Sequence, residues 1–282
     1  DAHHHQGRGG SQPQEAHRDQ EKKGVRASMA RNSSPATMAV LPVRPPCSIP
    51  VADSTKVPVV LEPKTAKSTV LMAIPGLLPP GTAVSGEILL DGKNLLTLPE
   101  NELNRIRWRR IAIVPQGAMN SFTPVLTVGR HVEEVLSVHL GLSRKEALDR
   151  IPSLFALAGL DGELARRYPH ELSGGQKQRA AIALALACSP DYLLCDEPTT
   201  ALDVITQQGI IATLKNLVEE KGLGLLLISH DLPLAASVAD RLHILKDGEL
   251  VEEGDPGEIT ARPRNPHTRA LVKALLDLEE ES

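Results

Sequence analysis

The stretch Leu172-Ser173-Gly174-Gly175-Gln176 decides the fold of this chain. Ser173 suits the N-cap of a helix predicted over residues 176–187, and the two glycines leave backbone NH groups open. A helix start of this kind, with the positive end of its dipole, can bind an anion. The alternative interpretation is an ordinary capped helix after a glycine turn. The residues downstream of this stretch distinguish an anion-binding helix start from such an ordinary helix.

A short apolar run, Tyr192 to Cys195, ends abruptly in Asp196-Glu197-Pro198. This pattern is typical of a buried parallel strand whose carboxyl end delivers acidic side chains into a crevice. Asp196 suits a magnesium shell, and Glu197 suits orienting or deprotonating a water molecule. Two acids at a plain strand-to-turn junction are the alternative interpretation.

His230 follows a second apolar run, Leu225 to Ile228, and Asp231 and Pro233 after it favour a helix start. A histidine in such a place is often structural. Its position after a second strand end, downstream of the acids, favours a functional role.

Taken in order, these motifs resemble the ATP-binding subunits of ABC transporters. LSGGQ is similar to the family signature, residues 193–197 to its Walker B strand with a catalytic glutamate, Ala201-Leu202-Asp203 to its D-loop, and His230 to its switch histidine. Gln116, after the apolar run 111–114, resembles the Q-loop glutamine. The resemblance extends from about Lys67 to the C-terminus.

The resemblance implies ATP and Mg²⁺ as cofactors and two subunits facing head to tail. Catalysis would rest on Glu197 and His230, and magnesium on Ser68, Gln116 and Asp196. The implied ATP-binding residues are Lys67, Ser68, Thr69, Gln116, Ser173, Gly174, Gly175, Gln176 and Asp203. Lys67 would hold the β and γ phosphates, and residues 173–175 would close the partner's site.

Two further segments resemble subunits of oligopeptide, dipeptide and nickel importers. They are residues 119–128, which read MNSFTPVLTV, and residues 263–271, which read PRNPHTRAL. A loop and a capped final helix are the alternative interpretation. The resemblance implies a peripheral protein at the cytoplasmic face of the cell membrane. Its partners would be a second ATPase subunit, in a homodimer or heterodimer, transmembrane permease subunits and, indirectly, a substrate-binding protein.

The phosphate loop departs from the family pattern. Where the family has G-x-x-G-x-G-K-S/T-T, this chain has LEPKTAKST at residues 61–69. Pro63 removes an NH donor, and Leu61, Lys64 and Ala66 add Cβ atoms where backbone must approach phosphate. Two or three positions forced into positive φ at about 1–2 kcal/mol each would weaken ATP binding by about a hundredfold or more. The five aromatic residues, moreover, all lie downstream of the loop, so none can be the early adenine-stacking residue of the family.

Three functions are therefore compared. The first is an ATP-hydrolysing importer subunit for peptides or similar small solutes. The second is a catalytically impaired partner that donates its signature to an intact P-loop in another subunit. The third, a soluble ABC ATPase outside transport, lacks support, since there is no coiled-coil insertion, no basic stripe and no second cassette.

Alternating strands and helices predict a doubly wound, mostly parallel α/β sheet of the P-loop NTPase type with an inserted helical subdomain. The chain has 282 residues and a net charge of −4, which does not indicate a nucleic-acid-binding surface. Its three cysteines are far apart in the sequence and do not indicate a disulfide framework. No apolar run reaches the ~18 residues of a membrane span.

The predicted units are residues 1–60, disordered and unlike the family; 61–121, the first core part; 122–187, the helical signature subdomain; 188–262, the second core part; and 263–282, a C-terminal helix. Residues 1–60 hold seven prolines and a charge of +3, and the family's first strands are not recognisable there. We expect residues 1–66 to be a foreign or out-of-frame segment joined to an ABC body near Lys67.

Overall fold

A central six-stranded sheet organises the computed structural model, which describes residues 27–28, 37–38, 58–61 and 67–280. The strand order is β10-β9-β3-β8-β7-β6. The strands are β3 (Pro58–Leu61), β6 (Ile111–Val114), β7 (Tyr192–Asp196), β8 (Gly224–Ser229), β9 (Arg241–Lys246) and β10 (Glu249–Gly254). All neighbouring pairs are parallel except β9 and β10. The predicted doubly wound parallel sheet is confirmed, with β10 as an antiparallel edge that the sequence did not predict.

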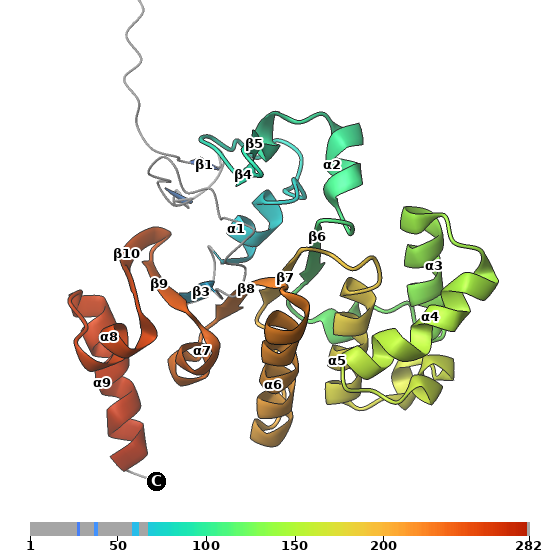
Figure 1. The fold of residues 1–282 in the computed structure, drawn as a ribbon. Helices are drawn as coiled ribbons and strands as arrows, with labels where there is room; N and C mark the ends of the chain where they lie inside the picture. The colour runs from blue at the N-terminus through green and yellow to red at the C-terminus, as the bar shows by residue number, and fades with distance from the viewer. Residues whose placement is uncertain (1–26, 29–36, 39–57, 62–66, 281–282) are drawn as a thin grey trace, which may run out of the picture.

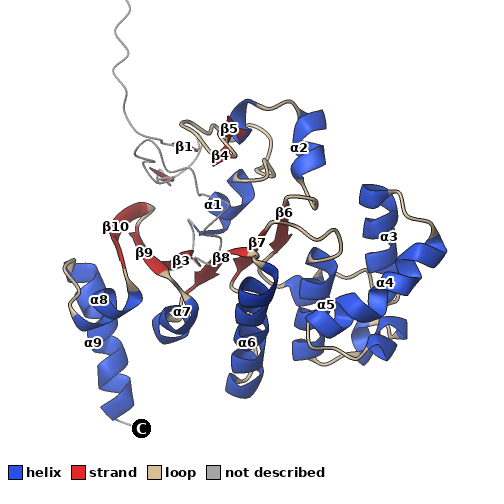
Figure 2. Ribbon diagram, viewed as in Figure 1, coloured by secondary structure: helices blue, strands red, loops and turns tan. Residues whose placement is uncertain are grey.

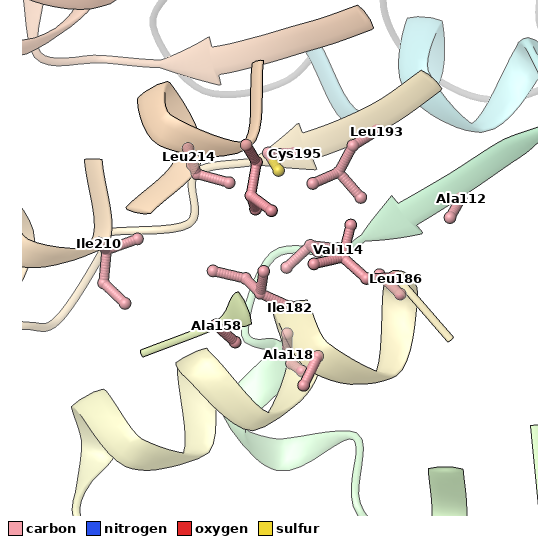
Figure 3. Close-up of a cluster of buried hydrophobic side chains, with 14 of the residues drawn as sticks. Ala112, Val114, Ala118, Ala158, Ile182, Leu186, Leu193, Cys195, Ile210 and Leu214 are labelled. Atoms are coloured by element: carbon pink, nitrogen blue, oxygen red, sulfur yellow. The ribbon is translucent and has the colours of Figure 1, made fainter. Parts of the chain in front are cut away.

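Successive residues of each strand point to opposite faces of the sheet, and both faces are buried. Leu193 and Cys195 join the larger core, while Leu194 between them joins a smaller core on the other face. Figure 3 shows how the larger core forms, with Val114, Leu193 and Cys195 from the sheet meeting Ile182, Leu186, Ile210 and Leu214 from two helices. This packing fixes the strands and therefore the loops at their carboxyl ends.

The helices cover the sheet and extend beyond one edge of it (Figures 1 and 2). Those on the larger core are α5 (Gly174–Ala185), α6 (Val204–Lys221) and α7 (Leu232–Val238), and α1 (Lys67–Ala73) packs on the opposite face. Helices α3 (Val128–Leu140) and α4 (Arg144–Leu157) pack against α5 beyond β6 and form the predicted helical unit.

Helix boundaries follow the capping residues rather than the apolar pattern. The apolar pattern predicts helices from residues 130, 176 and 206, and each begins two residues earlier in the structure. The side chains of Ser173 and Asp203 cap two of these helices, while Thr127 holds the N-cap position of the third without a side-chain hydrogen bond. Ser143 and Glu146 close a capping box, and α4 begins where it was predicted. Pro75 was expected to shorten the helix after Lys67, and α1 indeed ends at Ala73.

The sequence from Glu87 to Leu90 predicts a strand, and this prediction is mostly wrong. Only β4 (Leu89–Leu90) is extended, and it pairs with β5 (Lys93–Asn94) in a separate hairpin. Asp91 and Gly92 between them have φ of 51° and 76°, the signs that a two-residue hairpin turn of type I′ requires. The turn reverses the chain before a longer strand can form, and α2 (Glu100–Ile106) follows.

The described parts of the first sixty residues are three strand segments. The two-residue strands β1 (Ala27–Ser28) and β2 (Thr37–Met38) pair with each other, and β3 enters the central sheet between β8 and β9. The chain therefore joins the sheet three residues before residue 61, and β3 stands in the middle of the sheet where early strands were expected to be absent. The rest of residues 1–60 lies outside the described residues.

The C-terminal part packs beside β10. It consists of α8 (Pro256–Ala261) and α9 (Pro266–Glu280). Glu252 of β10 accepts hydrogen bonds from the backbone amides of Arg264 and Asn265, at 2.8 and 3.1 Å, and so fixes the start of α9. Asn265 in turn accepts a hydrogen bond from the amide of His267 at 2.8 Å. Residues 263–271 are thus a loop and a capped helix, whatever else they do.

Candidate functional site

The carboxyl ends of neighbouring parallel strands bring the predicted residues together. Gln116 follows β6, Asp196 ends β7 and His230 follows β8, and the same edge faces the first turn of α1. The Ser68 hydroxyl donates a hydrogen bond of 2.5 Å to Oδ2 of Asp196, although 128 residues separate the two. Asp196 is 3% exposed, so its carboxylate is held at the floor of the site. Two hard oxygen donors at one point are suitable ligands for a divalent cation.

Glu197 lies one residue beyond the strand, in a strained turn. Its φ is 46°, in the left-handed region that disfavours a side chain, and its amide donates to the carbonyl of Ile228 at 2.9 Å. The strain turns the carboxylate out of the sheet and into the site. Its side chain is 13% exposed, so the carboxylate is mostly buried but still reaches solvent.

Side chains of three described residues contact the Glu197 carboxylate. Gln116 Nε2 donates to Oε2 at 3.2 Å, and the Thr200 hydroxyl donates to the same oxygen at 2.9 Å. His230 Nδ1 lies 3.2 Å from the other oxygen, Oε1, and the imidazole is 60% exposed. Gln116 is also exposed. Two of the three contacts therefore come from side chains with room to turn toward a ligand.

Sequence reasoning singled out Gln116, Glu197 and His230 but missed Thr200. The signal was present: a hydroxyl residue three positions after an acid in a turn can reach back to its carboxylate. The motifs between β7 and α6 predict that the strand ends at Pro198, but they do not predict the turn that follows. The geometry of this turn directs the Thr200 hydroxyl toward Glu197.

The glycine-rich segment forms the predicted helix start. Ser173 Oγ accepts a hydrogen bond from the amide of Gln176 at 3.2 Å, and Gln176 Oε1 accepts one from the amide of Ser173 at 2.9 Å. This is a complete capping box, in which each side chain accepts a hydrogen bond from the other residue's backbone amide. Ser173 and Gly174 are exposed and Gly175 is half-buried, so the start of this helix is accessible from solvent.

A second capped helix packs directly on the glycines. Asp203 caps α6 by accepting from the amide and the hydroxyl of Thr206, at 2.9 and 2.7 Å. The Thr206 hydroxyl lowers the pKa of Asp203, which keeps the exposed cap ionised. A Cβ on Gly175 would lie 2.5 Å from Thr206 Cγ2, so only glycine allows α5 and α6 to approach this closely. A cavity of about 570 Å³ opens beside this contact, between Ser173, Gln176, Arg179 and Ile205.

The structure thus divides the predicted residues into two groups, each with contacts of its own. Ser68, Gln116, Asp196, Glu197 and His230 form one group at the strand ends. Ser173 to Gln176 and Asp203 form the other at the α5 and α6 starts. Thr69 is half-buried in α1. The side chain of Lys67 and the loop 62–66 lie outside the described residues.

Comparisons with known proteins show which family the chain is similar to. A family model described as ABC transporter matches residues 65–200. The chain is 41% identical over 223 residues to a probable peptide ABC transporter ATP-binding protein of Sinorhizobium fredii, covering 78% of this chain and 67% of that protein. It is 38% identical over 232 residues to a dipeptide transport ATP-binding protein of Caldanaerobacter subterraneus, covering 81% and 71%. An oligopeptide transport ATP-binding protein of Bacillus subtilis is 40% identical over 225 residues, covering 78% and 63%.

Solved structures give the same result. The fold matches the dimeric structure of a bacterial ABC transporter cassette with a TM-score of 0.66 and 30% identity, over 82% of this chain and 98% of that one. It also matches a post-hydrolysis dimer of that cassette bound to ADP and phosphate, with a TM-score of 0.64. This chain spans about two thirds of the length of its sequence relatives but nearly the whole of that cassette.

Proposed function

The chain belongs to the ABC transporter family of ATP-binding proteins, and we propose that it is the nucleotide-binding subunit of an importer for peptides or similar small solutes. One observation carries the proposal: the Ser68 hydroxyl and the Asp196 carboxylate meet at 2.5 Å, with Glu197 beside them. The peptide class rests on the printed names of the relatives and on the two importer-like segments in the sequence.

In this proposal Ser68, Asp196 and Gln116 would hold the magnesium ion of Mg-ATP. Magnesium favours one or two carboxylate or hydroxyl oxygens from protein and takes its other ligands from phosphate and water. The ion would neutralise phosphate charge as it develops during hydrolysis. Lys67 and Thr69, at the start of α1, would bind the phosphates of ATP.

Glu197 orients the attacking water and takes its proton. A strained turn and a mostly buried side chain give this carboxylate a fixed direction, which a general base requires. His230, on the other carboxylate oxygen and 60% exposed, is free to turn to the γ-phosphate.

The second group of residues acts on a neighbouring subunit. Ser173, Gly174, Gly175 and Gln176 are presented at an outward helix start, with Asp203 capping the adjacent helix, and the cassette of similar structure is a dimer. We propose that this signature closes the nucleotide site of a second ATPase subunit.

Transport itself requires other chains. None of the helices in residues 67–280 combines the length and apolarity needed to cross a bilayer. In the proposal permease subunits form the pore, a substrate-binding protein selects the solute, and this subunit docks peripherally at the cytoplasmic face of the membrane.

A second candidate function is kept because of one sequence observation. The aligned phosphate loop, residues 61–69, has no glycine, and glycines are what allow backbone amides to surround phosphates. With its own loop weakened, the chain would donate its signature to a partner with an intact loop and contribute half of an asymmetric pair.

Titration of the purified chain with Mg-ATP, alone and mixed with a partner subunit that has an intact P-loop, separates these functions. Micromolar binding and turnover by the chain alone, lost on Glu197→Gln, would establish the first. Activity in the mixture alone, lost on Ser173→Arg but not on Glu197→Gln in this chain, would establish the second. Absence of activity in every combination would refute both.

A further inference from the structure

We infer that Thr200 is a positioning residue for the general base, an inference that rests on the proposed hydrolysis of ATP. Its hydroxyl donates a hydrogen bond of 2.9 Å to Oε2 of Glu197. Thr200 belongs to none of the motifs that resemble the ABC family. Its contact with Glu197 depends on the geometry of the turn between β7 and α6.

The turn fixes where the Thr200 hydroxyl lies. The amide of Thr200 donates to the carbonyl of Glu197 at 3.2 Å, which closes a four-residue turn, and Ala201 has a φ of 65°. The backbone bond and the side-chain bond join the same two residues, so the hydroxyl and the carboxylate move as one unit. Thr200 is half-buried, and its β-branched side chain has few rotamers available.

Thr200 is held in place by the turn, whereas the other two side chains that contact the carboxylate are not. Gln116 and His230 reach Glu197 from 81 residues before it and 33 residues after it, on separate strand ends, and both are exposed. In the proposed mechanism Gln116 turns to magnesium and His230 to the γ-phosphate. Thr200 then keeps its hydrogen bond to Oε2, and this bond sets the direction of the carboxylate toward the water.

Thr200 matters to the base because a carboxylate accepts a proton only in the direction of its lone pair. A carboxylate acts as a base through a lone pair of one oxygen, and its rotation about χ3 is soft. A hydroxyl fixed on the other oxygen restricts that rotation, and misplacement of a catalytic group by about 1 Å can cost about a hundredfold in rate. Thr200 contacts no nucleotide in this scheme. It acts through Glu197.

Steady-state ATP hydrolysis by the full chain, in whichever preparation is active without substitution, tests the inference with three variants. Thr200→Val removes the hydroxyl at nearly constant shape, Thr200→Ser retains it, and Thr260→Val is the matched control. Thr260 is half-buried in α8, where its hydroxyl donates to the carbonyl of Pro256 at 2.8 Å. We expect Thr200→Val to lower kcat about tenfold with KM for ATP within about twofold. Thr200→Ser should stay within about threefold of the unmodified kcat, and Thr260→Val should leave both constants unchanged.

Equal losses in Thr200→Ser and Thr200→Val, or a rise in KM at constant kcat, would overturn the positioning role. A second measurement does not depend on turnover: crystal structures of the unmodified and Thr200→Val chains. We expect the Glu197 carboxylate to occupy a different rotamer in Thr200→Val, and an unchanged carboxylate would refute the inference. An inactive unmodified chain in every pairing would count against the proposed function, while the crystal structures would still decide the role of Thr200.

Discussion

Ser68 at the start of α1 and Asp196 at the end of β7 share a hydrogen bond of 2.5 Å across 128 residues of sequence. The start of α1 and the acidic strand end are therefore parts of a single site. We expect Asp196→Asn to weaken nucleotide binding in the presence of magnesium about tenfold or more, a loss of about 1.4 kcal/mol per factor of ten. The asparagine still accepts from Ser68, so the fold should be retained while the charge for the cation is lost.

Isothermal titration with ATP, with and without magnesium, measures this effect. Asp149→Asn, on the exposed side of α4, is the charge-matched control and should bind as the unmodified chain does. If Asp196→Asn keeps the full magnesium dependence, Asp196 is not a ligand of the ion.

Glu197→Gln is expected to abolish turnover without abolishing binding. An amide cannot accept the proton of the attacking water, and general bases contribute about a hundredfold or more to rate. It can still accept hydrogen bonds from Thr200 and Gln116, so the turn should be maintained. We expect phosphate release to be lost and nucleotide binding to be retained when both are measured on the same preparation. Substantial residual turnover would show that the catalytic base lies in another subunit.

The close contact between α5 and α6 predicts different outcomes for two adjacent glycines. In Gly175→Ala the new Cβ would lie 2.5 Å from Thr206 Cγ2, and Thr206 cannot turn away while its hydroxyl holds Asp203. We expect a loss of about 1–3 kcal/mol in the free energy of unfolding. In Gly174→Ala the nearest atom, Leu202 Cδ2, would be at 3.4 Å, an ordinary contact, so that variant should be close to neutral.

Urea unfolding of both variants tests this difference. Adding Thr206→Ser, which removes Cγ2 but keeps the hydroxyl, should restore most of the stability lost in Gly175→Ala. A double variant no more stable than Gly175→Ala would show that the loss has another cause.

The two described cysteines are buried, and burial controls their chemistry. Desolvation raises the pKa of the Cys188 thiol to about 11 and raises that of Cys195 further. Both groups therefore remain protonated thiols at pH 8, and the thiolate is the reactive form. We expect Ellman's reagent to leave both unlabelled in the native chain at pH 8 and to label them after denaturation. Rapid native labelling at either position, located by mass spectrometry, would contradict the core packing.

Glu252 predicts a dependence of stability on acid pH. Burial raises the pKa of this carboxyl, but the neighbouring Thr268 hydroxyl and the amides of Arg264 and Asn265 lower it more, to below its ordinary value of 4.5. A carboxyl whose pKa is depressed on folding contributes stability that is complete above 4.5 and is lost as the pH falls below it. We expect Glu252→Gln to cost about 1–2 kcal/mol at pH 7 and to show a smaller decline in stability below pH 4.5.

Thermal unfolding between pH 3 and pH 7 measures the effect, and the exposed Glu249 on the same strand supplies the control, Glu249→Gln. If the two variants have the same pH profile, Glu252 does not anchor α9.

The sequence by itself determined the main strands of the site and the helix starts beside them, and it predicted the chemistry that they carry. Apolar runs that end in acids or histidine predicted β7 and β8 and their functional residues, because a strand buried on both faces has to be apolar and its carboxyl end has to open at the sheet edge. Ser173 and Asp231 marked helix starts, because capping is a local interaction that depends on neighbouring residues.

The tertiary structure decided which of these elements meet. The register of β6, β7 and β8 brings Gln116 and His230 onto Glu197, and the packing of α1 brings Ser68 onto Asp196. The antiparallel edge β10, the short β4 and the approach of Gly175 to Thr206 also came only from the fold. Contacts of this kind depend on distances between segments far apart in the chain. Local sequence patterns specify the conformation of each segment, whereas side-chain packing between segments sets those distances.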